Sequence, residues 1–221
     1  PSGCQEGNAI EVRNFGTSPT SAVAITQNFI SGYQKTGIVV NGNSDGKVSA
    51  NTVDGIAPVG YIARNGIQIG FGATAQVKNN KVLNNSYTGT STVSGGILVV
   101  GGPYYGSDYG KGSQVDGNTI TGNDIGVFLS NLEADGSAPV VQTNIKVINN
   151  TISNGALNNH YGGSGYQAGI SDVGNNDKLI NNNISGAGYD PDSNTGAYTV
   201  GIDADPSFTN KAKIHANDIE P

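Results

Sequence analysis

The chain has 221 residues, a net charge of −6, 35% hydrophobic and only 13% charged side chains, and 34 glycines. The negative charge argues against nucleic acid as a partner, because phosphate binding needs clustered Lys and Arg. No apolar run approaches the roughly 20 residues of a membrane-spanning helix. So much glycine with so little charge favours short strands joined by turns over a compact helical domain.

One pattern recurs along the chain: an apolar residue, Asn three positions later, and Ile or Val two positions after the Asn. Self-similarity at a period of about 30 residues predicts a solenoid. In chain order the seven copies are Ile25/Asn28/Ile30, Val48/Asn51/Val53, Val77/Asn80/Val82, Val115/Asn118/Ile120, Val147/Asn150/Ile152, Leu179/Asn182/Ile184 and Ile214/Asn217/Ile219.

A second pattern, Gly followed by Ile or Val, lies between these copies. It begins a short segment of alternating apolar residues, which is typical of a strand. With no helical segment between them, such strands can pair in parallel with their counterparts one coil further along. The pairs are Gly37-Ile38, Gly66-Ile67, Gly96-Ile97, Gly126-Val127, Gly169-Ile170 and Gly201-Ile202.

The repeated Asn has a physical explanation at a corner between two strands. Asn tolerates left-handed backbone angles, and its amide group both donates and accepts hydrogen bonds. Because the seven Asn residues share one phase, we expect an internal ladder of stacked side chains. The alternative is that they are ordinary turn formers on the surface.

From Ile10 to Ile219 the chain resembles the right-handed parallel β-helix superfamily, which includes pectate-lyase-like proteins and secreted bacterial β-helix repeat proteins. The resemblance rests on phrases such as Gly117-Asn118-Thr119-Ile120 and Ile148-Asn149-Asn150-Thr151-Ile152. It implies an all-β fold: one domain, residues 1–221, forming a single right-handed parallel β-helix of about seven coils. It implies little about activity, because fold does not determine function.

Four segments, 101–112, 131–143, 154–165 and 186–197, lengthen the later coils, and no long insertion is expected in the first three. Insertions in a solenoid usually gather on one face, often the binding face. Tyrosine in such loops suits sugar faces and protein interfaces, although the same loops would also serve to cover the sheet. The candidate binding residues are Tyr104, Tyr105, Tyr109, Phe128, Tyr161, Tyr166 and Tyr189.

The resemblance implies enzymes that cleave acidic polysaccharides, but their catalytic sets are incomplete in this chain. It has no Asp-Asp pair, and His160 and His215 lie outside any Gly-His-Gly. We therefore do not expect an enzyme. If the chain is one, it is a polysaccharide lyase or glycoside hydrolase, with Asp172, Asp203 and Asp205 as candidate catalytic residues. The alternative is that these are solvated turn carboxylates.

Calcium is the cofactor that the carboxylates would suit, since it prefers oxygen ligands. The candidate ligands are Asp190, Asp192, Asp203 and Asp205. No other cofactor is expected, and the lone Cys4 permits no internal disulfide.

The sequence favours a secreted, non-catalytic scaffold or binding module located outside the cell or at its surface. Polysaccharide is the expected ligand. Open strand edges at the ends of the stack, or the outward apolar face, favour self-association, and end-to-end contacts would give an extracellular fibre. The alternatives are a polysaccharide lyase or hydrolase acting on an acidic glycan, and a fragment of a longer surface β-helix protein.

Overall fold

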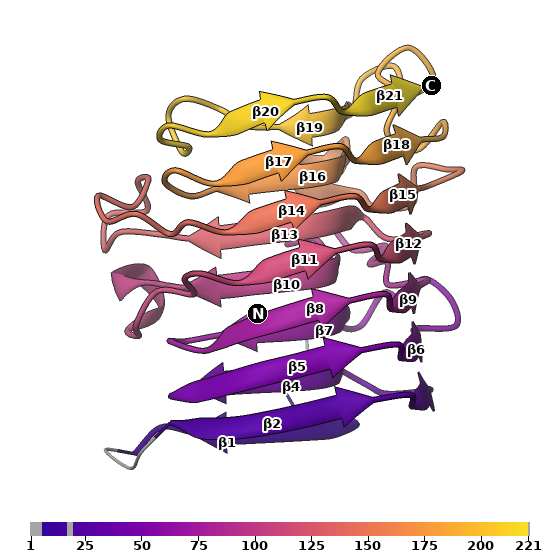
Figure 1. The fold of residues 1–221 in the computed structure, drawn as a ribbon. Coiled ribbons are helices and arrows are strands. Elements are labelled where there is room, and N and C mark those ends of the chain that lie inside the picture. Colours follow the sequence, from indigo (N-terminus) through magenta and orange to yellow (C-terminus); the bar gives the residue numbers. More distant parts are fainter. Residues whose placement is uncertain (1–5, 17–19, 221) are drawn as a thin grey trace.

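The computed structural model describes residues 6–16 and 20–220, in which three parallel β-sheets of seven strands each form an all-β fold compatible with a parallel β-helix (Figure 1). Cys4 lies outside the described residues. The predicted all-β class and the parallel pairing of counterpart strands are confirmed. The described helices are two short 3-10 turns, η1 (Pro103–Tyr105) and η2 (Tyr161–Gly163).

Each sheet takes every third strand. Sheet A contains β1 (Ile10–Asn14), β4 (Thr36–Gly42), β7 (Asn65–Gly70), β10 (Gly95–Gly101), β13 (Ile125–Asn131), β16 (Tyr166–Val173) and β19 (Tyr198–Asp203). Sheet B contains β2 (Ser21–Thr26), β5 (Ser44–Ser49), β8 (Thr74–Lys78), β11 (Gln114–Asp116), β14 (Lys146–Ile148), β17 (Lys178–Ile180) and β20 (Lys213–His215). Sheet C contains β3 (Phe29–Ser31), β6 (Thr52–Asp54), β9 (Lys81–Leu83), β12 (Thr119–Thr121), β15 (Thr151–Ser153), β18 (Asn183–Ser185) and β21 (Asp218–Glu220).

The core is filled by alternate side chains of each strand. Ile67, Ile97 and Val127 share one register position of sheet A and are fully buried. Burying one such side chain contributes roughly 1.5–3 kcal/mol. Corresponding columns come from the other two sheets: Val48, Val77, Val115, Val147 and Leu179 in sheet B, and Val53, Val82, Ile120, Ile152 and Ile184 in sheet C.

The asparagines of the repeated pattern lie between sheets B and C and are hydrogen-bonded to one another. Asn80 Nδ2 donates to Asn118 Oδ1, and Asn118 Nδ2 donates to Asn150 Oδ1, each at 3.0 Å. Asn118 Nδ2 also donates to the Val77 carbonyl oxygen at 2.9 Å. The same side-chain contact joins Asn28 to Asn51, Asn51 to Asn80, Asn150 to Asn182, and Asn182 to Asn217. The amide groups of these side chains therefore form hydrogen bonds within the fold and are not candidates for ligand binding.

The glycine of each Gly-Ile or Gly-Val pair lies where sheets A and C approach closely. A Cβ atom on Gly66 would come within 2.3 Å of Val82 Cγ1, and one on Gly126 within 2.4 Å of Ile152 Cγ2. A larger residue would push the two sheets apart, which explains why this pattern accompanies the Asn pattern along the chain.

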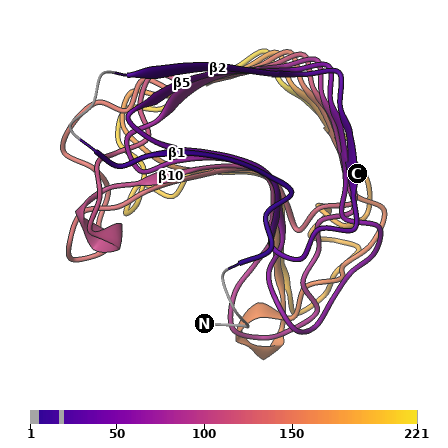
Figure 2. The same ribbon diagram turned by 90° about the horizontal axis from the view of Figure 1, so that it is seen from below.

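The long connections leave the ends of the sheet A strands, so loops extend beyond both sides of that sheet (Figure 2). The four predicted insertions coincide with connections between strands. The expectation of no long insertion early in the chain was wrong, because segments 55–64 and 84–94 also form long connections. The repeat spacing concealed them, because the connections from β4 to β5 and from β7 to β8, residue 43 and residues 71–73, are so short that more of a normal period is left for the later loop.

Candidate functional site

The outer face of sheet A carries two adjoining cavities of about 560 and 550 Å³. Together they form one elongated hollow, here called the sheet A groove, bordered by strands β10 and β13 and by the loops beside them. This is the kind of concave, mixed apolar and polar surface that binds ligands. The residues common to both cavities are Ser91, Thr92, Val93, Tyr104, Tyr105, Phe128 and Ser130.

Aromatic side chains from the 102–113 connection form one wall of the groove. Tyr104 and Tyr105 lie in η1 with their ring centroids 5.1 Å apart in a T-shaped arrangement. The Tyr105 hydroxyl lies 2.8 Å from Ser130 Oγ, and burial raises the pKa of Tyr105. Tyr104 is 57% exposed. Tyr105 is thus fixed to the sheet, whereas the Tyr104 ring is available to a ligand.

The opposite wall depends on Asp124, a buried carboxylate between β12 and β13. It accepts hydrogen bonds from the backbone N–H groups of Tyr87 and Ser94 at 2.9 Å, and from Asn159 Nδ2 at 3.3 Å. Burial raises the pKa of Asp124 to about 6, and these hydrogen bonds oppose that shift. Through these hydrogen bonds the Asp124 carboxylate holds both ends of the 84–94 connection against β13. The middle of that connection then lies along the groove.

At the C-terminal end the groove becomes acidic. Tyr166 donates a hydrogen bond from its hydroxyl to Asp203 Oδ2 at 2.6 Å, and that hydroxyl lies 2.9 Å from Ser171 Oγ. Burial, followed by the bond to Asp203, raises the pKa of Tyr166 well above its usual range. Asp205 lines the same cavity and accepts a hydrogen bond from the Ser207 backbone N–H at 2.7 Å. The groove therefore presents two carboxylates beside its aromatic rings.

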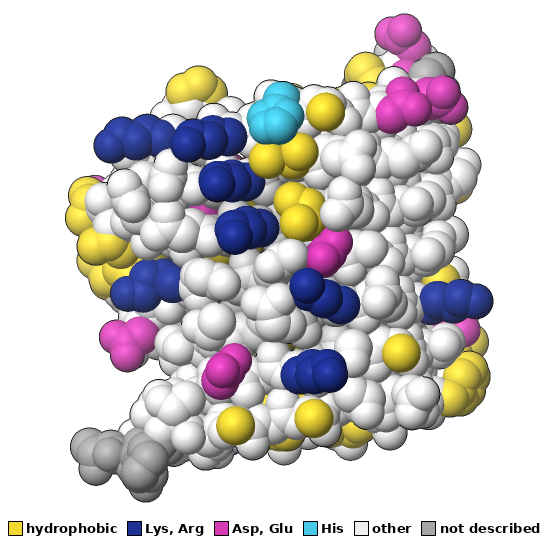
Figure 3. Space-filling model, in the orientation of Figure 1, with side chains coloured by type: hydrophobic (Ala, Val, Ile, Leu, Met, Phe, Trp, Pro, Cys, Tyr) yellow, Lys and Arg dark blue, Asp and Glu magenta, His cyan; other side chains and the backbone are white. Residues whose placement is uncertain are grey.

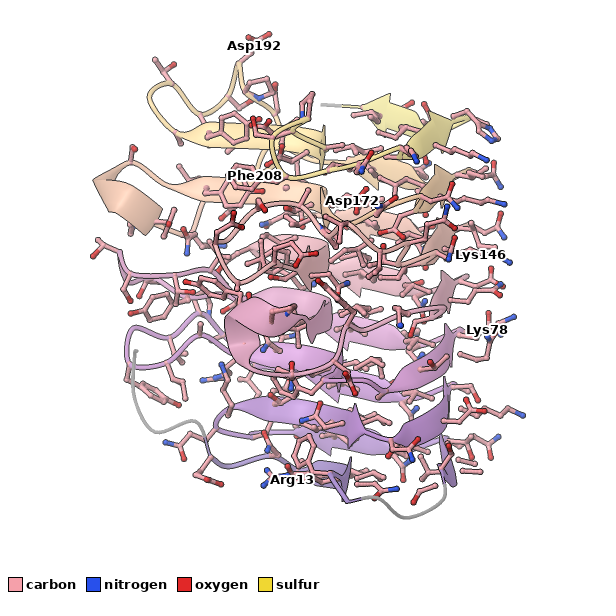
Figure 4. The ribbon with its side chains drawn as sticks, turned by 90° about the vertical axis from the view of Figure 1, so that its left-hand side faces the viewer. Arg13, Lys78, Lys146, Asp172, Asp192 and Phe208 are labelled. Atoms are coloured by element: carbon pink, nitrogen blue, oxygen red, sulfur yellow. The ribbon has the colours of Figure 1, made fainter. Side chains whose placement is uncertain are left out.

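Asp172 borders the groove but its carboxylate belongs to the interior. Asp172, labelled in Figure 4, is in register with Leu129 of the neighbouring strand. Both its oxygens are buried, and no N–H or hydroxyl group in the described part of the chain donates to them. Burial first, then the charge of Asp177, raises the pKa of Asp172. Asp177 itself accepts hydrogen bonds from Thr143 Oγ1 at 2.7 Å and the Ile145 N–H at 2.6 Å. Asp172 is thus not presented to a groove ligand.

The structure brings together most of the candidate binding residues. Tyr104, Tyr105, Phe128, Tyr161 and Tyr166 line one cavity together with Asp203 and Asp205.

Other candidates lie elsewhere. Tyr189 is only 3% exposed and donates its hydroxyl hydrogen to the Asn123 carbonyl oxygen at 2.9 Å. Tyr109 donates to Glu133 Oε1 at 2.5 Å. Asp190 accepts a hydrogen bond from the Asp192 N–H at 3.0 Å, and Asp192 lies at the top of Figure 4, apart from Asp172.

Several groove residues were not found from the sequence. Ser91, Thr92 and Val93 come from the unexpected 84–94 connection, and Leu132 and Phe208 come from connections flanking sheet A. None of them lies in a recurring pattern. Their part in the groove follows from contacts between segments far apart in the chain, such as Asn159 Nδ2 donating to the Thr92 carbonyl oxygen at 3.0 Å.

Three further findings concern metal ligands, membrane-spanning helices and similarity to known proteins. Within residues 6–16 and 20–220, no three His, Cys, Asp or Glu side chains gather as potential metal ligands, so calcium binding by the candidate aspartates stays a prediction. None of the helices in the described ranges has the length and apolar character needed to cross a membrane. Comparison with protein-family profiles, with curated proteins and with solved structures gave no match.

Proposed function

We propose that the chain is an extracellular, non-catalytic binding module whose sheet A groove holds a glycan chain. We further propose that its fold is a right-handed parallel β-helix of about seven coils, related to the pectate-lyase-like proteins, with an internal asparagine ladder. The three parallel sheets and the hydrogen bonds between aligned Asn side chains support this assignment. A rigid stack suits such a role because it fixes the groove walls before a ligand arrives.

The observation that carries the proposal is the combination of exposed rings and polar groups in one elongated groove. Tyr104 and Tyr161 are 57% and 48% exposed, and Phe128, Asp203 and Asp205 line the same cavity. Aromatic rings pack against the apolar faces of sugars, while hydroxyl and carboxylate groups bind sugar hydroxyls. An elongated groove favours a chain over a single sugar unit.

The test is binding to a panel of neutral and acidic oligosaccharides, measured by calorimetry. Tyr104→Ala and Phe128→Ala should each weaken binding about tenfold, corresponding to about 1.4 kcal/mol. Phe29→Ala removes a ring that is 75% exposed on sheet C and is the matched control. The proposal fails if no glycan binds, or if the Phe29 variant loses as much affinity as the groove variants.

A second candidate function is cleavage of an acidic polysaccharide, favoured by the placement of Asp203 and Asp205. Tyr166 fixes Asp203, and Asp205 follows two residues later at the same end of the groove. One carboxylate as acid and the other as base would suit glycosidic bond cleavage. Release of new reducing ends that disappears in Asp203→Asn and persists in Asp192→Asn would establish it. No product from any glycan of the panel would exclude it.

Self-association remains a prediction from the sequence. Ile214 and Ile219, in β20 and β21, are 45% and 52% exposed, whereas their counterparts in the preceding strands are buried. Exposed apolar side chains next to unpaired strand edges favour contact with a second copy. Filaments in electron micrographs would support the fibre. The alternative is a longer natural protein, in which further coils would cover Ile214 and Ile219.

A further inference from the structure

Sheet B carries a column of lysines on the face turned away from the core. The register aligns Lys146 of β14 with Lys178 of β17, and Lys178 with Lys213 of β20. We call these three residues the lysine ladder. Figure 3 shows dark blue side chains gathered over this part of the sheet. The exposed Lys211 precedes Lys213 by two residues in the chain.

The charge of this column is unusual for the chain that carries it. The whole chain has a net charge of −6, yet three consecutive strands place lysines side by side. Among the described residues the ion pairs are Arg13 with Glu11 and Lys78 with Asp116, so no acid neutralises the ladder. Like charges directly opposite on neighbouring strands repel one another, and an external anion would relieve that repulsion.

The fold itself does not require lysine at this register position. In the two preceding strands the same position is held by Gln76 and Gln114, which are neutral, and in the strand before them by Lys47. Two positions further along the strand, Ile148 and Ile180 form a half-buried apolar column parallel to the ladder. The surface is therefore a straight row of charges, about 4.8 Å apart at the backbone, with an apolar strip beside it.

We propose that the lysine ladder binds a linear acidic polysaccharide lying along the axis of the stack. A polymer with one carboxylate or sulfate group at regular intervals matches a row of evenly spaced ammonium groups. Nucleic-acid surfaces combine positive charge with rings on which bases stack. The strands of sheet B contain no Tyr, Phe or Trp, and Lys146 points away from Phe208 of the sheet A groove in Figure 4.

The ladder is a second surface, separate from the sheet A groove. A glycan bound in the groove and an acidic polymer bound at sheet B would occupy different sides of one rigid stack. The chain would then connect two polymers, or two parts of one polymer, in an extracellular matrix.

The test uses a polyuronate and its methyl-esterified form, which has lost the charges, with affinity measured at low and at high salt. Lys146→Gln/Lys178→Gln should weaken polyuronate binding at least tenfold, with little binding of the ester. Lys81→Gln/Lys111→Gln removes the same charge from exposed lysines outside the strands of sheet B and should leave binding within about twofold of the parent. Circular dichroism confirms that both variants fold.

Three outcomes would overturn the proposal. The first is an equal loss in the two double variants, which would mean attraction by overall charge. The second is no polyuronate binding at low salt. The third is tighter binding of single-stranded DNA or anionic vesicles than of the polyuronate, which would assign the ladder to another class of polyanion. Because Tyr104→Ala alters the groove alone, it should leave ladder binding intact, and this separates failure of one surface from failure of the other.

Discussion

Replacing Asn118 by Ala tests how much the hydrogen-bonded asparagines stabilise the stack. The Asn118 side chain accepts from the Asn80 backbone N–H at 2.9 Å and from Asn80 Nδ2 at 3.0 Å. It also donates to the Val77 carbonyl oxygen and to Asn150 Oδ1. The substitution removes all four bonds and leaves polar backbone groups buried without partners.

At about 1 kcal/mol for each buried hydrogen bond, the loss amounts to about 4 kcal/mol. This is a large fraction of the roughly 5–15 kcal/mol by which folded domains are stable. Urea unfolding followed by circular dichroism, with extrapolation to water, measures the free energy of unfolding directly. The midpoint should fall sharply while the overall β-sheet spectrum of the folded variant is retained.

The control is Asn183→Ala, which removes an exposed Asn from strand β18. That variant should stay within about 0.5 kcal/mol of the parent, as surface substitutions usually do. If Asn118→Ala costs less than about 1 kcal/mol, or no more than Asn183→Ala, the asparagine contacts do not stabilise the fold, and the physical argument for the repeated Asn is wrong.

Two other predictions concern the interior. Burial and the charge of Asp177 raise the folded-state pKa of Asp172 above its unfolded value. The folded chain therefore binds a proton at the Asp172 carboxyl group more tightly than the unfolded chain does. As a result, the free energy of unfolding falls as pH rises from about 4 towards neutrality. Asp172→Asn should flatten that decline in urea midpoints between about pH 5 and about pH 8, and an unchanged slope would contradict the assignment. Gly126→Ala, whose Cβ would meet Ile152 and a backbone oxygen, should cost about 1–3 kcal/mol or more, whereas Gly155→Ala, with open space around it, should be nearly neutral in the same assay.

Much of the fold could be predicted because its signals are local and repeated. Alternating apolar residues after each Gly-Ile pair specify a strand and its inward face, and a constant period brings counterpart strands into parallel register. The same alternation places Asp172 inside, since Ile170 of the same strand faces the core. Asp172 was predicted as a catalytic residue because it is acidic, without regard to this inward position.

The candidate site was only partly predictable. Tyr104, Tyr105 and Tyr161 were expected at a common face because long insertions gather there, and they line one cavity. Tyr189 was chosen by the same reasoning, yet its ring is buried and its hydroxyl bonds to Asn123 of a distant segment. Composition identifies loops rich in Tyr, but it does not reveal which rings turn inward.

The sequence by itself determined the repeating strands, the inward columns of Ile and Val, and the phase of the asparagines, because each depends on neighbours one or a few residues away. The lysine ladder also follows from the register once the repeat is known. Only the tertiary structure decided the groove. Its walls depend on contacts such as those of Asp124 with Tyr87 and Asn159, which join loops far apart in the chain. Such contacts carry no periodic signal, since each is made once.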